Sequence, residues 1–128
     1  MGSRGPITAD TVQGVCRRGN VRDGAVEEVI RWVAGSWRCE AHIWHAEHLI
    51  VDFVMVARDE SGEVTARLDC AHNEIHVHMY DRRPPLRHVL THLTGDPNHD
   101  KHAVSQAYEG CWDVFNALAE GKRPWAKR

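Results

Sequence analysis

Residues 64–80 read Val-Thr-Ala-Arg-Leu-Asp-Cys-Ala-His-Asn-Glu-Ile-His-Val-His-Met-Tyr, and this stretch decides the fold. Apolar and polar side chains alternate along 64–70 and again along 75–80. This alternation predicts two strands, because successive side chains of a strand point to opposite faces of a sheet. A short connection joins neighbouring antiparallel strands, so we expect a hairpin whose turn lies at His72-Asn73.

The register of this hairpin follows from the same pattern. A turn at His72-Asn73 places Leu68 opposite Val77, and every facing pair on that side is apolar. A slip of one residue would set Asp69 opposite Val77 and mix the two faces, which burial of one face forbids. The polar side is then made of three facing pairs: Asp69 with His76, Arg67 with His78 and Thr65 with Tyr80.

Two further strands are expected before the hairpin. Residues 37–44 alternate with period two, and residues 49–58 are largely apolar on both faces, as in a central strand. A turn at Ser61-Gly62 sets Val54 beside Asp69 and extends the sheet outward. One face of the predicted sheet is therefore apolar. The other, open face carries Glu40, His42, Asp52, Arg67, Asp69, His76, His78 and Tyr80.

Three segments have the spacing of amphipathic helices, in which apolar residues recur at i, i+3, i+4 and i+7. They cover 23–34, 86–93 and a last stretch that stops at Gly121. Their stripes are Val26, Val29, Ile30 and Val33 in the first, Leu86, Val89, Leu90 and Leu93 in the second, and Val104, Ala107, Tyr108, Cys111, Phe115 and Leu118 in the third. The expected fold class is α+β: a four-stranded antiparallel meander with amphipathic helices packed on one face, in the order α-β-β-β-β-α-α.

Length and composition indicate one domain. The chain has 128 residues and a net charge of −2, so the domain as a whole does not attract nucleic acid or acidic membranes strongly. We expect 1–22 to be a flexible or loosely packed N-terminal arm, 23–121 a single α+β domain and 122–128 a basic C-terminal tail. A signal-peptide pattern, an apolar run of membrane length and a C-x-x-C pair are all lacking. The expected location is therefore cytoplasmic, with reduced thiols.

Histidine is over-represented, with ten residues in the chain. On the polar face, a carboxylate beside His76 would fix its tautomer and leave a general acid or base near neutrality. The alternative is a divalent metal such as zinc, iron or nickel, with the ligands His72, His76, His78 and Asp69. Arg67 favours the first hypothesis, because a guanidinium repels a cation but binds phosphate. We therefore expect an anion, and no obligatory cofactor, at this site.

A polar sheet face is often ordinary surface, and the remaining histidines are weaker candidates. His88 and His92 lie four residues apart on the polar side of the predicted second helix, without a carboxylate as third ligand. His42, His45 and His48 span a strand end and a turn, so they should not converge. His99 and His102 fit the start of a helix. A third hypothesis is thus a non-catalytic module whose polar face binds a protein.

The stretch Ala66-Arg67-Leu68-Asp69-Cys70-Ala71-His72, followed by His76-Val77-His78, resembles the signature of the TumE-like toxins of bacterial toxin–antitoxin systems. The likeness covers about Phe53 to Tyr80. This chain departs from the pattern in having no proline between Ala71 and His72 and a shorter gap before His76. The resemblance implies a growth-inhibitory protein neutralised by a cognate antitoxin, and it implies a functional set of Arg67, Asp69, His72, His76 and His78.

Together these observations predict a small toxin-like protein that acts on RNA or another phosphate-bearing target. The enzyme class would be a metal-independent, ribonuclease-like or other phosphate-directed hydrolase. His76, oriented by Asp69, and His78 would supply the acid and base, and Arg67 would bind phosphate. The expected partners are an antitoxin and RNA, with no membrane. A homodimer follows if the stripe of the last helix packs against a second copy.

Overall fold

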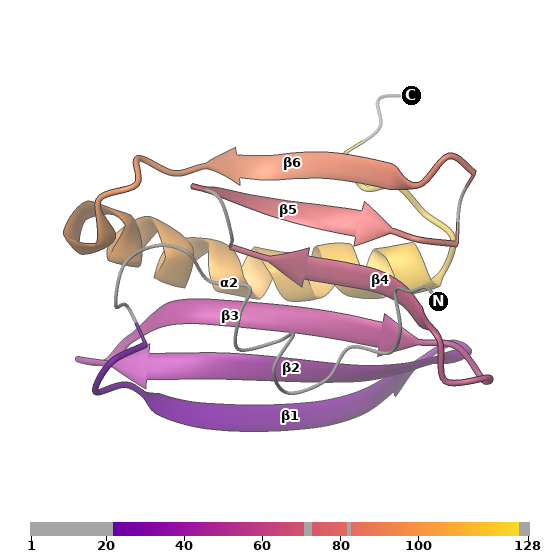
Figure 1. Cartoon of the computed structure of the whole chain (residues 1–128), viewed down its shortest axis with the longest axis horizontal. Coiled ribbons are helices and arrows are strands. Elements are labelled where there is room, and N and C mark those ends of the chain that lie inside the picture. Colours follow the sequence, from indigo (N-terminus) through magenta and orange to yellow (C-terminus); the bar gives the residue numbers. More distant parts are fainter. Residues whose placement is uncertain (1–21, 71–72, 82, 126–128) are drawn as a thin grey trace, which may run out of the picture.

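The computed structural model describes residues 22–70, 73–81 and 83–125. These residues form one antiparallel sheet and one long helix, so the protein is predominantly β (Figure 1). In chain order the elements are β1 (Val26–Ala34), β2 (Trp37–Ala46), β3 (Leu49–Arg58), β4 (Val64–Asp69), β5 (Glu74–Met79), β6 (Leu86–His92) and α2 (Pro97–Ala119). The strands neighbour one another in sequence order, as an up-and-down meander. Figure 1 shows α2 behind the sheet, running along the strands.

The main core lies between α2 and the sheet. Every second side chain of a strand points toward the helix. The helix packs against them with Val104, Cys111, Phe115 and Leu118. The sheet's share is Trp37, Cys39, Ala41, Ile43, Phe53, Met55, Ala57, Ala66, Leu68, Cys70, Ile75, Val77 and Met79. The predicted last helix is thus confirmed, with its apolar stripe inward and Glu109, Asp113 and Glu120 exposed.

The predicted hairpin register is confirmed. Leu68 pairs with Val77, Asp69 with His76, and Arg67 with His78. Val54 also pairs with Asp69 as expected. At the turn, His72 lies outside the described residues, whereas Asn73 has a φ of 62°, a left-handed conformation that Asn tolerates better than most residues.

The predicted fold class is wrong about the first helix, because 23–34 forms the edge strand β1. Ile30, Trp32 and Ala34 alternate toward the core, while Val29 and Val33 point to the other face. Spacings of four are common to a helix stripe and a strand face, and β-branched residues favour the strand. Gly35, with a φ of 59°, belongs to the tight turn that returns the chain into β2.

The second predicted helix is also wrong, because 86–93 contains the strand β6. Leu86, His88 and Leu90 alternate toward the helix-covered side, with Val89 opposite His76 on the other face. The sheet therefore has six strands instead of four, and the described residues contain one helix instead of several. Trp125, in the predicted basic tail, stacks on His88 with ring centroids 4.1 Å apart.

Candidate functional site

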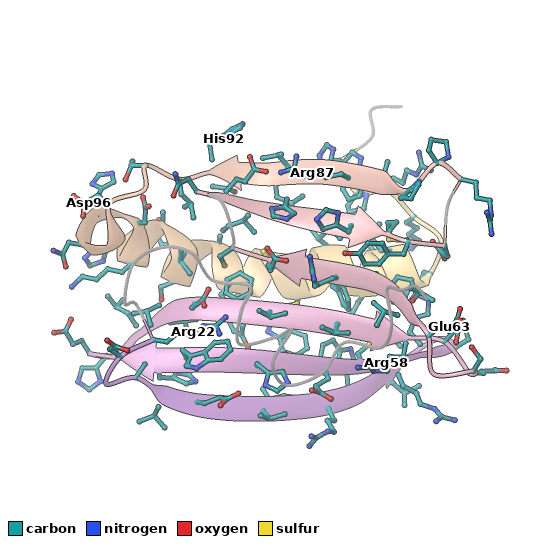
Figure 2. The ribbon with its side chains drawn as sticks, viewed as in Figure 1. Arg22, Arg58, Glu63, Arg87, His92 and Asp96 are labelled. Carbon is teal, nitrogen blue, oxygen red and sulfur yellow. The ribbon has the colours of Figure 1, made fainter. Side chains whose placement is uncertain are left out.

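A row of ion pairs crosses β4, β5 and β6 on the face away from α2. Arg67 Nε lies 3.0 Å from Asp69 Oδ2, and Asp69 Oδ1 lies 3.4 Å from His76 Nε2. On its other side His76 Nδ1 lies 3.6 Å from Glu74 Oε1, and Glu74 pairs with Arg87. Figure 2 labels Arg87 on β6. We call these five residues, Arg67, Asp69, His76, Glu74 and Arg87, the charge row.

Two aromatic rings continue from His76 along β5. His78 meets the His76 ring edge-on, with centroids 4.8 Å apart. Tyr80 stacks on His78 at 5.5 Å and an interplanar angle of 5°. This alternation follows from the strand, since residues 76, 78 and 80 project to one face. The arrangement places the His76 imidazole, which is paired with a carboxylate, against the His78 imidazole, which in turn stacks on Tyr80.

The members of the site differ in their access to solvent. Asp69 is 0 % exposed and His76 is 2 % exposed, whereas the Arg67 side chain keeps 21 % exposure. His78 and Tyr80 are half-buried. The prediction of a fully open polar face is therefore wrong for Asp69, His76 and Asp52. A ligand arriving from solvent would meet Arg67, His78 and Tyr80 rather than the Asp69–His76 pair.

The charge row holds its charges close together without ideal hydrogen-bond geometry. Within the described part of the chain, Arg67 Nε and Glu74 Oε1 are buried atoms whose ion-pair contacts do not align as hydrogen bonds. Buried ionic groups are costly unless they are well paired, and incompletely satisfied polar networks are unusual in a core. Such networks occur at functional sites and also as structural ion-pair networks.

The predicted metal site gains no support from the described residues. Across 22–70, 73–81 and 83–125, no group of three His, Cys, Asp or Glu side chains could hold a metal ion. His72, the fourth proposed ligand, lies outside those ranges. The Arg67 guanidinium also lies beside Asp69, where its positive charge opposes a bound cation.

Glu40, His42 and Asp52 share the predicted face but belong to other contacts. His42 lies between two carboxylates, with Nδ1 2.7 Å from Glu27 Oε2 and Nε2 close to Glu40. Asp52 accepts a 2.6 Å hydrogen bond from Arg22 Nε, and the Arg22 guanidinium lies over Trp44, 3.7 Å from the ring centroid. Figure 2 shows Arg22 in front of β2 and β3.

A second apolar cluster separates these contacts from the charge row. It consists of Trp44, Val51, Val54 and Val56, with Ala25, Ala46, Leu49 and Val64 packed around them. The face away from the helix is therefore apolar in its centre, with one set of ionic contacts on β1 to β3 and the charge row on β4 to β6. The predicted polar residues do share one face, but they do not form one site.

The remaining histidines do not join the site. His88 faces the helix side of β6 and stacks on Trp125, while His92, His99 and His102 are exposed. His45 Nε2 pairs with Glu28 at 2.8 Å, and His48 lies in the β2–β3 turn. The prediction that placed His88 and His92 together on one helix face is wrong, because both belong to β6.

Two members of the charge row, Glu74 and Arg87, were missed in the sequence. A helix over 86–93 gives Arg87 no place in the sheet, whereas in the strand β6 it pairs with His78. Glu74 directly precedes the expected strand 75–80, and the alternation of β5 extends back to it. Reading the period of two into both segments would have revealed the complete row.

The three thiols in the described residues lie outside this site. Cys39, Cys70 and Cys111 are buried and form no disulfide within the described residues. Burial raises the pKa of the Cys39 thiol to about 11 and that of Cys111 to about 12. Since the thiolate is the nucleophile, these two groups are inert near neutral pH.

Comparison of the chain with protein-family models, with curated proteins and with solved structures found no match. The likeness to TumE-like toxins thus stays a resemblance carried by the residues of its motif. Among the described residues, no helix combines the length and apolar character that crossing a membrane requires.

Proposed function

We propose that the protein is a toxin-like, metal-independent enzyme that acts on RNA at the outer side of the charge row. The observation that supports this most directly is the convergence of Arg67, Asp69 and His76 through contacts of 3.0 Å and 3.4 Å, with His78 against the His76 ring. A guanidinium and an imidazole on a common surface suit a phosphodiester, since one binds the anion and the other moves a proton.

Each accessible group has a role in this proposal. The Arg67 contact with Asp69 uses Nε, and the other N–H donors of the guanidinium belong to its terminal amino groups, which are the phosphate binders. Neutral His78 accepts the proton of a ribose 2′-hydroxyl as the oxygen attacks the neighbouring phosphorus. The bond from phosphorus to the 5′-oxygen breaks, and the leaving oxygen takes a proton from water. The products are a 2′,3′-cyclic phosphate and a 5′-hydroxyl, and His78 releases its proton to solvent.

Asp69 and His76 act as positioning residues. Both are buried, so they support the more accessible Arg67 and His78 from behind instead of touching the RNA. Asp69 contacts Arg67 on one side and His76 on the other. The edge-on contact with His76 fixes the orientation of the His78 ring. A rigid supporting layer of this kind keeps catalytic groups in productive geometry.

The stacked His78–Tyr80 pair favours RNA among phosphate-bearing ligands. Unpaired bases are commonly bound by stacking on aromatic side chains exposed on a sheet. The plane of Tyr80 lies nearly parallel to that of His78, so the two rings form a stack that an unpaired base would extend. In this proposal the protein acts in the cytoplasm and is neutralised by a cognate antitoxin that covers the same surface.

The test is cleavage of single-stranded RNA in the presence of a chelator, with identification of the cyclic phosphate end. Wild-type protein should cleave, His78→Gln should lose activity about 100-fold or more, and Arg67→Ala should weaken RNA binding as well as turnover. His102→Gln, an exposed histidine on α2, is the matched control and should behave as the wild type. Cleavage that requires an added metal, or that persists in His78→Gln, would contradict the proposal.

A further inference from the structure

The outer edge of β1 is the least protected part of the sheet. Within the described residues β1 pairs with β2 alone, in unbroken register from Val26 to Ala34. It contains no proline and no lysine, and three of its valines are exposed: Val26 by 70 %, Val29 by 39 % and Val33 by 72 %. Natural sheets protect exposed edges with proline, lysine or bulges, so a long, regular edge with exposed valines is a site for pairing with another strand. The partner strand must also match the charges of Glu27, Glu28 and Arg31.

The opposite edge of the sheet differs. The β5–β6 pairing has an irregularity between Ile75 and His76, Pro84 and Pro85 precede β6, and Trp125 stacks on His88. Each of these features hinders the addition of a strand, because prolines cannot donate backbone hydrogen bonds and bulges twist an edge. The two edges of the meander are therefore unequal, and β1 is the one suited to a partner.

We propose that β1 pairs antiparallel with β1 of a second copy, around a two-fold axis at Val29, to form a symmetric dimer with one continuous sheet. A two-fold axis perpendicular to the sheet sets residue 29 opposite itself and residue 27 opposite residue 31. Glu27 then faces Arg31 of the other copy on both sides of the axis. Val26 faces Trp32 and Val29 faces Val29, whereas Val33 lies opposite Ala25, the residue just before the strand.

Neighbouring registers lack this complementarity. Moving the axis by one residue toward the N-terminus puts Glu28 directly opposite Glu28 of the other copy. The same step toward the C-terminus puts Val29 opposite Arg31 and Glu27 opposite Val33. Like charges directly opposite one another destabilise a sheet, and a charge against an apolar side chain gains nothing. The register centred on Val29 also sets Glu28 opposite Ile30. Among these three registers, however, it is the one that pairs Glu27 with Arg31 of the other copy and has no like charges directly opposite one another.

Glu27 and Arg31 each have a partner within the chain, but both side chains keep enough exposure to reach a second copy. The Arg31 side chain is 72 % exposed, and its nearest carboxylate, on Glu40, is 3.6 Å away. Glu27 keeps 35 % exposure, with Oε2 2.7 Å from His42 Nδ1, so its other oxygen is the one that would meet Arg31 of the second copy. Neither belongs to the charge row, so dimer formation and RNA cleavage are separable and each can fail without the other.

The first experiment is disulfide trapping of the full chain. Val29→Cys should form a disulfide-linked dimer rapidly under mild oxidation, because facing residues of paired strands lie within disulfide range. Val33→Cys is the matched control: its side chain is more exposed, yet the two copies of residue 33 would lie roughly 27 Å apart along the strands. Both variants carry Cys16→Ser to remove the thiol that lies outside the described residues.

Sedimentation velocity supplies the second readout. Wild-type protein should dimerise reversibly, whereas Glu27→Arg and Arg31→Glu should each weaken the dimer about tenfold, since each turns two attractive pairs into two repulsive ones. The double variant should recover wild-type dimerisation. A monomer of 14.5 kDa at every accessible concentration would overturn the proposal. Equal trapping of Val29→Cys and Val33→Cys, or a double variant no better than either single one, would overturn the register.

Discussion

Asp69 on β4 and His76 on β5 face each other across the sheet, with Asp69 Oδ1 3.4 Å from His76 Nε2 and neither side chain exposed to solvent. The Asp69 carboxylate also contacts Arg67 through its other oxygen. A carboxylate held between a guanidinium and an imidazole, inside a sheet, links the stability of the hairpin to the placement of the groups at its surface.

Asp69→Ala should lower the free energy of unfolding by about 3–5 kcal/mol, because it leaves Arg67 and His76 without their shared carboxylate in a buried setting. Chemical denaturation measures the change. Asp113→Ala, at an exposed position of α2, is the control and should change stability by less than about 0.5 kcal/mol. Equal stability of the two variants would show that Asp69 is not paired as described.

Leu68→Ala should cost about 2–5 kcal/mol, because Leu68 is fully buried between the sheet and α2 and its truncation leaves a cavity. Leu86→Ala, at the half-buried start of β6, should cost less. The same denaturation experiment compares the two. A larger effect at Leu86 would place the centre of the core closer to β6 than the structure has it.

Asp100 ties the start of α2 to the loop after β6. Its carboxylate accepts hydrogen bonds from Thr94 N at 2.9 Å, Thr94 Oγ1 at 2.7 Å and Gly95 N at 2.8 Å, and it is 1 % exposed. Asp100→Asn should destabilise the fold by about 1–3 kcal/mol, since an amide cannot accept all of these bonds with both of its polar atoms. Hydrogen exchange at the Thr94 and Gly95 amides should accelerate, and unchanged exchange would contradict this role.

Because of its buried thiols, the folded protein should lose stability at alkaline pH. In the folded protein burial raises the pKa of Cys111 from its ordinary value of 9.0 to about 12. The stability that this shift reflects is complete below about pH 9 and declines as pH rises toward 12, because only the unfolded chain releases the proton. Between about pH 8 and about pH 10 the free energy of unfolding should therefore fall less in Cys111→Ala than in the wild type. Urea unfolding of both proteins at each pH measures this difference.

The parts of the fold that could be predicted are those in which alternation has one solution. In the β4–β5 hairpin a one-residue slip would bury Asp69 among apolar side chains, so the register and the facing pairs of the site could be derived from residues alone. The α2 stripe from Val104 to Leu118 is long enough that only a helix satisfies it.

The parts that failed are short segments whose apolar spacing fits both periods. Leu86 and Leu90, four residues apart, lie on one face of a helix and also on one face of a strand. Whether such a segment becomes helix or strand depends on the free sheet edge beside it, which is a property of the folded chain. The burial of Asp69 and His76 could not be predicted either. Alternation assigns a side chain to one face of the sheet but does not show which residues cover that face.

The central claim, that Arg67 and His78 bind a phosphate-bearing ligand, is tested most directly by phosphate titration followed through the His78 ring resonances. The account predicts saturable shifts of the His78 imidazole that vanish in Arg67→Ala and persist in Arg38→Ala, an exposed arginine of β2 on the same face. Metal analysis of the same sample should show no stoichiometric zinc, iron or nickel. Absence of His78 shifts, or shifts that persist without Arg67, would contradict it.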